Sequence, residues 1–189
     1  MKVLVRKARK HDKSAFVELM ENAGSDLYKV GKAILKDDED VADAMQETAL
    51  NCWEKIDTLK NDGYFRTWLT RIMINNCYGI LRQKKKTVST EDAIQPAVVE
   101  DGYENVEWKE FLNCLDEKHR VVVILYYVQG FKTREIAKLL DLNESTVRGR
   151  LKAAREKMER QYCVVTGGTK KKRNEIPKNR FTAPMKLAE

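Results

Sequence analysis

Apolar residues recur every three or four positions along most of the chain, which is the spacing of one face of an α-helix. In the N-terminal half this pattern predicts helices over residues 13–20, 27–35, 40–56 and 64–83. The third begins at an acidic run, 37–40, and acidic side chains stabilise the positive N-terminal end of a helix. The fourth contains Gly79, which weakens a helix by about 1 kcal/mol relative to alanine unless something packs against it.

The periodic pattern stops between residues 87 and 104, where Ser, Thr, Pro, Gly and acidic residues are frequent. This composition predicts a flexible acidic linker. Helical spacing resumes over 105–128. The apolar run at 121–128 would also fit a buried strand, but its helical flanks and the Gln129-Gly130 pair, which is typical of a helix C-cap, favour a helix. The basic tail at 164–189 is predicted to be disordered.

Residues 133–158 predict two short helices joined by a tight turn. The turn is polar except for Leu142, which suits a residue lying between two crossing helices, and Asn143 is a natural N-cap for the second helix. This is the layout of a helix-turn-helix, whose second helix enters the DNA major groove. The expected apolar stripes are Ile136, Ala137 and Leu140 on the first helix, and Val147, Leu151, Ala154 and Met158 on the second.

The second helix of this motif carries cations on the face opposite its apolar stripe. Residues 144–163 hold six Lys/Arg and three Glu. Arginine can bond a guanine edge through two parallel donors, and lysine can pair with phosphate. Gly149 has no side chain to keep a duplex away. The residues expected to point outward are Ser145, Arg148, Gly149, Lys152, Arg155 and Glu156, with Arg150 on a flank.

Composition narrows the class of protein further. The chain has 189 residues, 42% hydrophobic and 34% charged, and no apolar run approaches the length that spans a bilayer. We therefore expect no direct membrane insertion and a cytoplasmic location. The four cysteines form no C-x-x-C pair, which argues against a zinc site and a disulfide scaffold. No nucleotide-binding or catalytic motif is present, so we expect no catalytic residues, no metal and no cofactor.

Charge is strongly segregated along the chain, although the net charge is +7. Residues 37–57 carry −7, residues 64–86 carry +6, residues 87–117 carry −8 and residues 164–189 carry +5. This alternation indicates partners of both signs.

Three motifs in order then identify a family. DVADAMQETALNCWEKI at 40–56, FRTWLTRIMINNCYGILRQKKK at 65–86 and the segment 115–158 resemble the bacterial sigma factors of the extracytoplasmic-function (ECF) group of the sigma-70 family. The resemblance covers roughly 1–86 and 105–160. It implies an all-α fold of two small helical domains, 1–86 and 105–163, joined by the linker 87–104, with the helix-turn-helix in the second.

The resemblance also implies partners and contact residues. The first domain would bind the clamp coiled coil of the catalytic subunit of core RNA polymerase and would recognise and melt the minus-ten element of promoter DNA. The second would read the minus-thirty-five element, and an anti-sigma factor at the membrane would restrain the protein. The expected polymerase contacts are Asp40, Asp43, Gln46, Glu47 and Thr48. At the minus-ten element, the base pocket would be formed by Asn61, Asp62, Gly63 and Asn75, and phosphates would be held by Arg66, Arg71, Arg82, Lys84, Lys85 and Lys86. At the minus-thirty-five element, base edges would be met by Arg148 and Lys152, and phosphates by Ser145, Thr146, Arg150 and Arg155.

Other classes of protein remain as alternatives. A stand-alone helix-turn-helix regulator would bind DNA without polymerase, but the strand-helix alternation of a receiver domain is not present. The sequence contains no recognisable catalytic motif, which argues against an enzyme. A helical adaptor protein would leave the basic faces of 64–86 and 144–163 without a function. The family pattern does not explain the tail at 164–189, which could add non-specific DNA affinity or be a solvated end.

Overall fold

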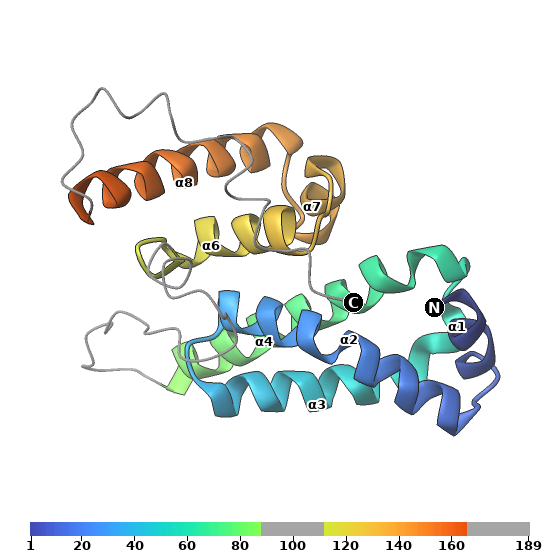
Figure 1. The fold of residues 1–189 in the computed structure, drawn as a ribbon. Helices are drawn as coiled ribbons and strands as arrows, with labels where there is room; N and C mark the ends of the chain where they lie inside the picture. The colour runs from blue at the N-terminus through green and yellow to red at the C-terminus, as the bar shows by residue number, and fades with distance from the viewer. Residues whose placement is uncertain (88–111, 166–189) are drawn as a thin grey trace. The chain divides into compact units, whose positions relative to one another are not determined.

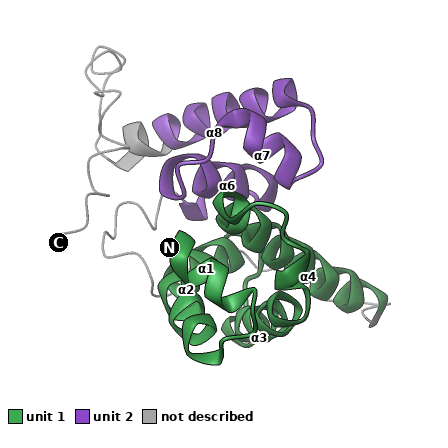
Figure 2. Cartoon of the chain, turned by 90° about the vertical axis from the view of Figure 1, so that its right-hand side faces the viewer, with its two compact units in different colours: residues 1–96 green, residues 97–189 purple. Residues whose placement is uncertain are grey.

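A computed structural model of the protein describes residues 1–87 and 112–165, with side chains for 1–86 and 112–160. The elements within these two ranges are all helical (Figure 1). The chain divides into two compact units, residues 1–96 and 97–189 (Figure 2). The all-α fold expected from the helical periodicity is confirmed.

The first unit is a helical bundle. It consists of α1 (Lys2–Ala8), α2 (Lys13–Ile34), α3 (Asp38–Lys55) and α4 (Phe65–Thr87), with two 3₁₀ turns between α3 and α4, η1 (Ile56–Thr58) and η2 (Asp62–Tyr64). Helices α2, α3 and α4 pack against one another, and α1 packs against α2 and η2 (Figure 1).

The helices of this unit differ from the sequence prediction at two places. The chain forms one helix, α2, where two were predicted, because Leu19 and Leu27 keep the same buried face across the polar segment between them. Helix α1 was not predicted at all. It is too short to show a clear period, yet it buries Val5 and Ala8 completely.

Helices α2, α3 and α4 approach one another closely at Gly31. A methyl group on its Cα would lie 2.7 Å from Met73 Cε and 2.9 Å from Val41 Cγ1. Hence α2 can lie against α3 and α4 only because this position lacks a side chain.

The second unit contains α6 (Glu117–Val123), the π-helical turn η3 (Ile124–Val128), α7 (Thr133–Leu139) and α8 (Glu144–Val165). The ambiguous run at 121–128 is helical, and its first five residues are fully buried, which explains its lack of amphipathic spacing. Gly130 ends the run in the left-handed region at φ +67°, as a C-cap glycine does.

The helix-turn-helix is formed by α7 and α8. Val147, Leu151, Ala154 and Met158 are buried, as their spacing predicted. Asp141 lies in the turn at φ +53°, and the amide of Leu142 donates to the carbonyl of Ala137 at 2.8 Å. Leu142 itself is half-buried in the turn.

Candidate nucleic-acid interface

The face of α8 opposite its buried stripe is open to solvent. Most of the predicted DNA contacts on this helix are exposed, and Arg150 on the flank is half-buried. The helix therefore presents its cations on one side and its apolar residues on the other. The exposed members are Ser145, Thr146, Arg148, Lys152 and Arg155.

Glu144 organises the start of α8. Its Oε1 accepts a hydrogen bond from Thr133 Oγ1 of α7 at 2.7 Å and one from Arg148 Nη2 at 2.6 Å. These two hydrogen bonds lower the pKa of the Glu144 carboxyl. The carboxylate joins the two helices of the motif and orients the guanidinium of Arg148 one turn further along.

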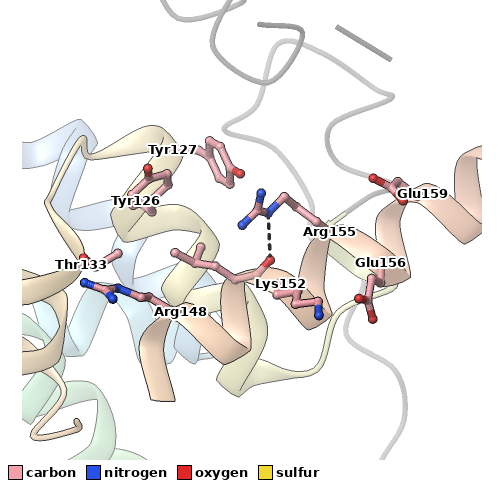
Figure 3. A pocket seen from close by; sticks show the side chains of 9 residues that line it. Tyr126, Tyr127, Thr133, Arg148, Lys152, Arg155, Glu156 and Glu159 are labelled. Carbon is pink, nitrogen blue, oxygen red and sulfur yellow. Dashed lines mark hydrogen bonds between the residues drawn. The ribbon is translucent and has the colours of Figure 1, made fainter. Parts of the chain in front are cut away.

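A hollow of about 700 Å³ lies beside the exposed cations of α8. Tyr126 and Tyr127 of η3 meet edge to face with ring centroids 4.9 Å apart. Figure 3 shows these rings across the hollow from the side chains of α8. Neither tyrosine was predicted from the sequence, because the apolar run before them shows no period that would indicate which face they occupy. The hollow is lined by Tyr126, Tyr127, Thr133, Arg148, Leu151, Lys152, Arg155, Glu156 and Glu159.

An acidic face runs along α3 in the first unit. Asp43, Gln46 and Glu47 are exposed, as a contact surface requires. Leu50, one turn further on, is 60% exposed and had not been singled out from the sequence. Its place three residues after Glu47 would have marked it as part of the same face.

Thr48 does not share that face. Its side chain is fully buried, its hydroxyl donates to the carbonyl of Ala44 at 2.6 Å, and it accepts from Asn76 Nδ2 at 3.0 Å. The expectation that Thr48 contacts a partner protein does not fit this position. The residue instead joins α3 to α4 inside the core.

The loop before α4 is a tight turn. Asn61 Oδ1 accepts from the amide of Gly63 at 2.8 Å, and the amide of Tyr64 donates to the carbonyl of Asn61 at 3.0 Å. Asp62 is turned away from solvent: Arg9 Nη1 lies 2.9 Å from its Oδ1 and Arg6 Nε 3.6 Å from its Oδ2. In this turn, which was expected to form the base pocket together with Asn75, the Asp62 carboxylate is thus paired with two arginines of the same unit.

The remaining residues expected to contact the minus-ten element lie along α4. Asn75 is exposed on α4, seven residues beyond Trp68, and the cations of α4 are exposed as well. Arg66 Nη2 lies 3.5 Å from Asp26 Oδ2 of α2. Lys84 Nζ lies 2.6 Å from Asp40 Oδ2 of α3. The exposed cations are Arg66, Arg71, Arg82, Lys84, Lys85 and Lys86.

No cluster of three or more His, Cys, Asp or Glu side chains with the geometry of a metal site occurs among the residues that the structure describes. Within the same residues, none of the helices combines the length and hydropathy needed to cross a membrane.

Comparison with known proteins decides the family. The family model of Sigma-70 region 2 matches residues 19–87, and that of Sigma-70 region 4 matches residues 106–158, together more than half of the chain. The chain belongs to the sigma-70 family. Curated sigma factors resemble it over most of their length. The sigma factor SigV of Bacillus subtilis is 25% identical over 158 residues, covering 82% of this chain and 95% of SigV.

Relatives of the ECF group show the same extent of similarity. ECF sigma factor SigW of Bacillus subtilis is 26% identical over 180 residues, covering 85% of this chain and 96% of SigW. The ECF sigma-E factor of Escherichia coli is 29% identical over 177 residues, covering 83% of this chain and 91% of sigma-E. This sigma factor is thus a member of the ECF group, and the family expected from its three motifs is confirmed.

Solved structures share the fold. CnrH, determined in complex with the cytosolic domain of CnrY, has a TM-score of 0.62 at 24% identity, covering 86% of this chain and 97% of CnrH. The sigma factor RpoE of Bartonella quintana, in complex with the anti-sigma factor NepR, has a TM-score of 0.59 at 23% identity, covering 80% and 96%. The protein is a polymerase-associated transcription initiation factor and not a stand-alone regulator. Sigma factors as a class are initiation factors rather than enzymes.

Proposed function

We propose that this sigma factor meets its partners through three charged faces: an acidic face on α3 for core polymerase, the 61–64 turn with α4 for the minus-ten element, and the outer face of α8 for the minus-thirty-five element. One observation carries the proposal. In α3, α4 and α8 one side buries apolar side chains in the core, while side chains of one predominant charge lie together on the exposed side.

The polymerase-binding face consists of Asp43, Gln46, Glu47 and Leu50. These residues are spaced by three, one and three positions, so they lie on one side of α3. A protruding leucine within a charged rim is the arrangement in which apolar contact supplies affinity and charge supplies orientation. The fitting partner is a basic helical surface, which the family resemblance assigns to the clamp coiled coil of the catalytic subunit. Thr48 has no part in this contact because it is buried.

The minus-ten element would meet the 61–64 turn and α4. Single-stranded bases are held by stacking surfaces and cationic grooves. Tyr64 is 66% exposed in the turn and offers a stacking surface beside Asn61, Gly63 and Asn75, which would line the base pocket. The phosphates of the opened strand would lie along Arg66, Arg71, Arg82, Lys84, Lys85 and Lys86.

The minus-thirty-five element would meet α8. Arg148 and Lys152 reach base edges, while Ser145, Thr146, Arg150 and Arg155 hold phosphates. Tyr126 lies 39% exposed across the hollow from these cations, where a hydroxyl can donate to a phosphate oxygen.

We assign core binding and minus-ten recognition to residues 1–86, and minus-thirty-five recognition to 105–163. Apart from Thr87, which ends α4, the proposed linker at 87–104 lies outside the described residues, as do residues 166–189 of the tail. The protein acts in the cytoplasm, and an anti-sigma factor is its proposed regulator.

Binding to core RNA polymerase tests the proposed role of the acidic face on α3. Asp43→Lys together with Glu47→Lys reverses two exposed charges, so we expect the purified variant to lose capture by immobilised core RNA polymerase. Glu18→Lys with Glu21→Lys, which reverses two exposed charges on α2, is the matched control and keeps binding. Capture of the α3 variant at the wild-type level in both low and moderate salt would reject the assignment.

A further inference from the structure

The Asp62 carboxylate lies between two arginines of the N-terminal segment. Arg9 Nη1 donates to Asp62 Oδ1 at 2.9 Å, and Arg6 Nε lies 3.6 Å from Asp62 Oδ2. The Asp62 side chain is only 16% exposed. Hydrogen bonds between a guanidinium and a carboxylate are among the stronger ones in proteins, and this one joins residues 53 positions apart. The turn before α4 is therefore fastened to the end of α1.

The arginine end of this contact is itself held in place. Arg9 follows the last residue of α1, and two positions later His11 adopts the left-handed conformation at φ +58°. A non-glycine residue seldom adopts this conformation unless its surroundings hold it there. The His11 ring packs edge-on against Trp53 of α3 with centroids 5.0 Å apart, and Phe16 packs against the same indole at 4.9 Å. The junction that carries Arg9 is thus anchored on α3.

The guanidinium of Arg9 relies on the Asp62 carboxylate as its counter-charge. Arg9 Nε is buried and has no hydrogen-bond partner within the described part of the chain. A partly desolvated cation of this kind is costly without a counter-charge, so the pair favours one position of the turn. Without the pair, the turn would also present an uncompensated carboxylate to the phosphates of DNA.

We infer that α1 belongs to the minus-ten site: Arg9, assisted by Arg6, is a positioning residue that holds the 61–64 turn in the conformation that receives a promoter base. Arg9 acts through Asp62 and does not touch the base. This inference rests on the proposed role of the turn, and it gives Asp62 a structural task in place of the DNA contact expected from the sequence.

Promoter opening by the reconstituted holoenzyme tests the inference. The probe is a duplex promoter fragment that the holoenzyme transcribes, carrying 2-aminopurine in the minus-ten element, whose fluorescence rises when the base unstacks. The variants are Arg9→Gln, Asp62→Asn and the two combined. Lys10→Gln is the matched control, because it removes the same charge from the next position of the chain and lies outside the contact with Asp62.

We expect Arg9→Gln and Asp62→Asn each to slow opening about ten-fold, the change that corresponds to one charge-assisted hydrogen bond. The double variant should be no slower than the single ones, because both remove the same contact. Lys10→Gln should stay within about two-fold of the wild type, and Arg9→Lys should regain most of the loss. Affinity for core polymerase should not change in any of them.

Two results would overturn the inference. Equal slowing by Arg9→Gln and Lys10→Gln, relieved together by lowering the salt, would mean that α1 supplies charge only. Normal opening by both Arg9→Gln and Asp62→Asn, while Asn61→Ala slows it, would mean that the turn does not need α1. The proposed function of the turn fails separately, if Asn61→Ala also leaves opening and the preference for the minus-ten base unchanged.

Discussion

Lys84 Nζ lies 2.6 Å from Asp40 Oδ2, so a cation at the end of α4 is paired with a carboxylate at the start of α3. The hydrogen bond to Asp40 raises the pKa of the Lys84 amine, and the nearby acids Asp37 and Glu39 act in the same direction. Lys84 belongs to the surface proposed for DNA, and Asp40 borders the surface proposed for polymerase. The two surfaces of the first unit therefore meet in one ion pair.

This pair predicts a competition between the carboxylate and DNA. Asp40→Asn removes the competing charge, so affinity of the protein for a forked minus-ten DNA should rise at low salt. The slope of log affinity against log salt should become steeper by roughly 0.9, the value for one more phosphate contact. Folding stability should change by less than about 1 kcal/mol, because the pair is partly exposed. Fluorescence anisotropy across a salt series measures the slope, and Asp40→Asn with Lys84→Gln, which should return it to the wild-type value, is the control.

Two glycines of α2 should respond in opposite directions to the same substitution. Gly24→Ala meets nothing within 4 Å, so it should stabilise the fold by about 0.5–1 kcal/mol through helix propensity. Gly31→Ala forces Met73 and Val41 to move, so it should destabilise by about 1–3 kcal/mol. Urea unfolding of both variants measures the difference. Stabilisation by Gly31→Ala would show that the three helices are not as closely packed as described.

Arg148 and Arg150 should differ in what they contribute to promoter recognition. Arg148→Ala should cost about 1–3 kcal/mol and relax the preference at one base pair, whereas Arg150→Ala should weaken binding to all sequences by a similar factor. Holoenzyme binding to a set of single-base variants of the minus-thirty-five element distinguishes the two. An even loss on every sequence for both substitutions would contradict the division between base and phosphate contacts.

Asp116 should make the second unit sensitive to acid. Burial raises the pKa of its carboxyl, but hydrogen bonds from the side chain and amide of His119 and from Lys157 outweigh burial and bring the pKa to about 2. Its folded pKa lies below the ordinary value near 3.9, so the charge stabilises the fold fully above about pH 4, and this contribution is lost as the pH falls toward 2. The stability difference between wild type and Asp116→Asn should shrink over that interval in urea titrations.

The same residue also caps α6, which gives a control. Its side chain accepts a hydrogen bond from the amide of His119 at 3.1 Å. Asp116→Ala should therefore cost about 1 kcal/mol even where Asp116→Asn costs little, because asparagine can still accept that bond. Equal effects of the two substitutions at pH 7 would mean that the charge, and not the cap, stabilises this helix.

The sequence predicted well those features that depend on neighbours along one helix. The buried stripe of α8 and the C-cap at Gly130 follow from spacing and residue type alone. Contacts between distant segments could not be predicted in this way. Thr48 fits the acidic face in spacing and motif, and only its partner Asn76, 28 positions away, reveals that it is buried.

For the candidate site, the sequence likewise predicted which segments carry charged side chains, but not which of these side chains pair with one another. Charge runs located the acidic and basic helices, and the family motifs gave them roles. Nothing local marks Asp62 as the partner of Arg9, or Asp40 as the partner of Lys84, because these pairs span 53 and 44 positions. Helix α1 was missed for a related reason: its two fully buried residues find their partners elsewhere in the bundle.

Run-off transcription with purified core RNA polymerase and a genomic DNA library tests the central claim most directly. The wild-type protein should direct the polymerase to a limited set of start sites that share one minus-ten and one minus-thirty-five sequence. Asp43→Lys with Glu47→Lys should abolish these transcripts, and Arg148→Ala should alter the minus-thirty-five sequence selected. Transcripts that start at random, or the same start sites from core polymerase without the protein, would contradict the account.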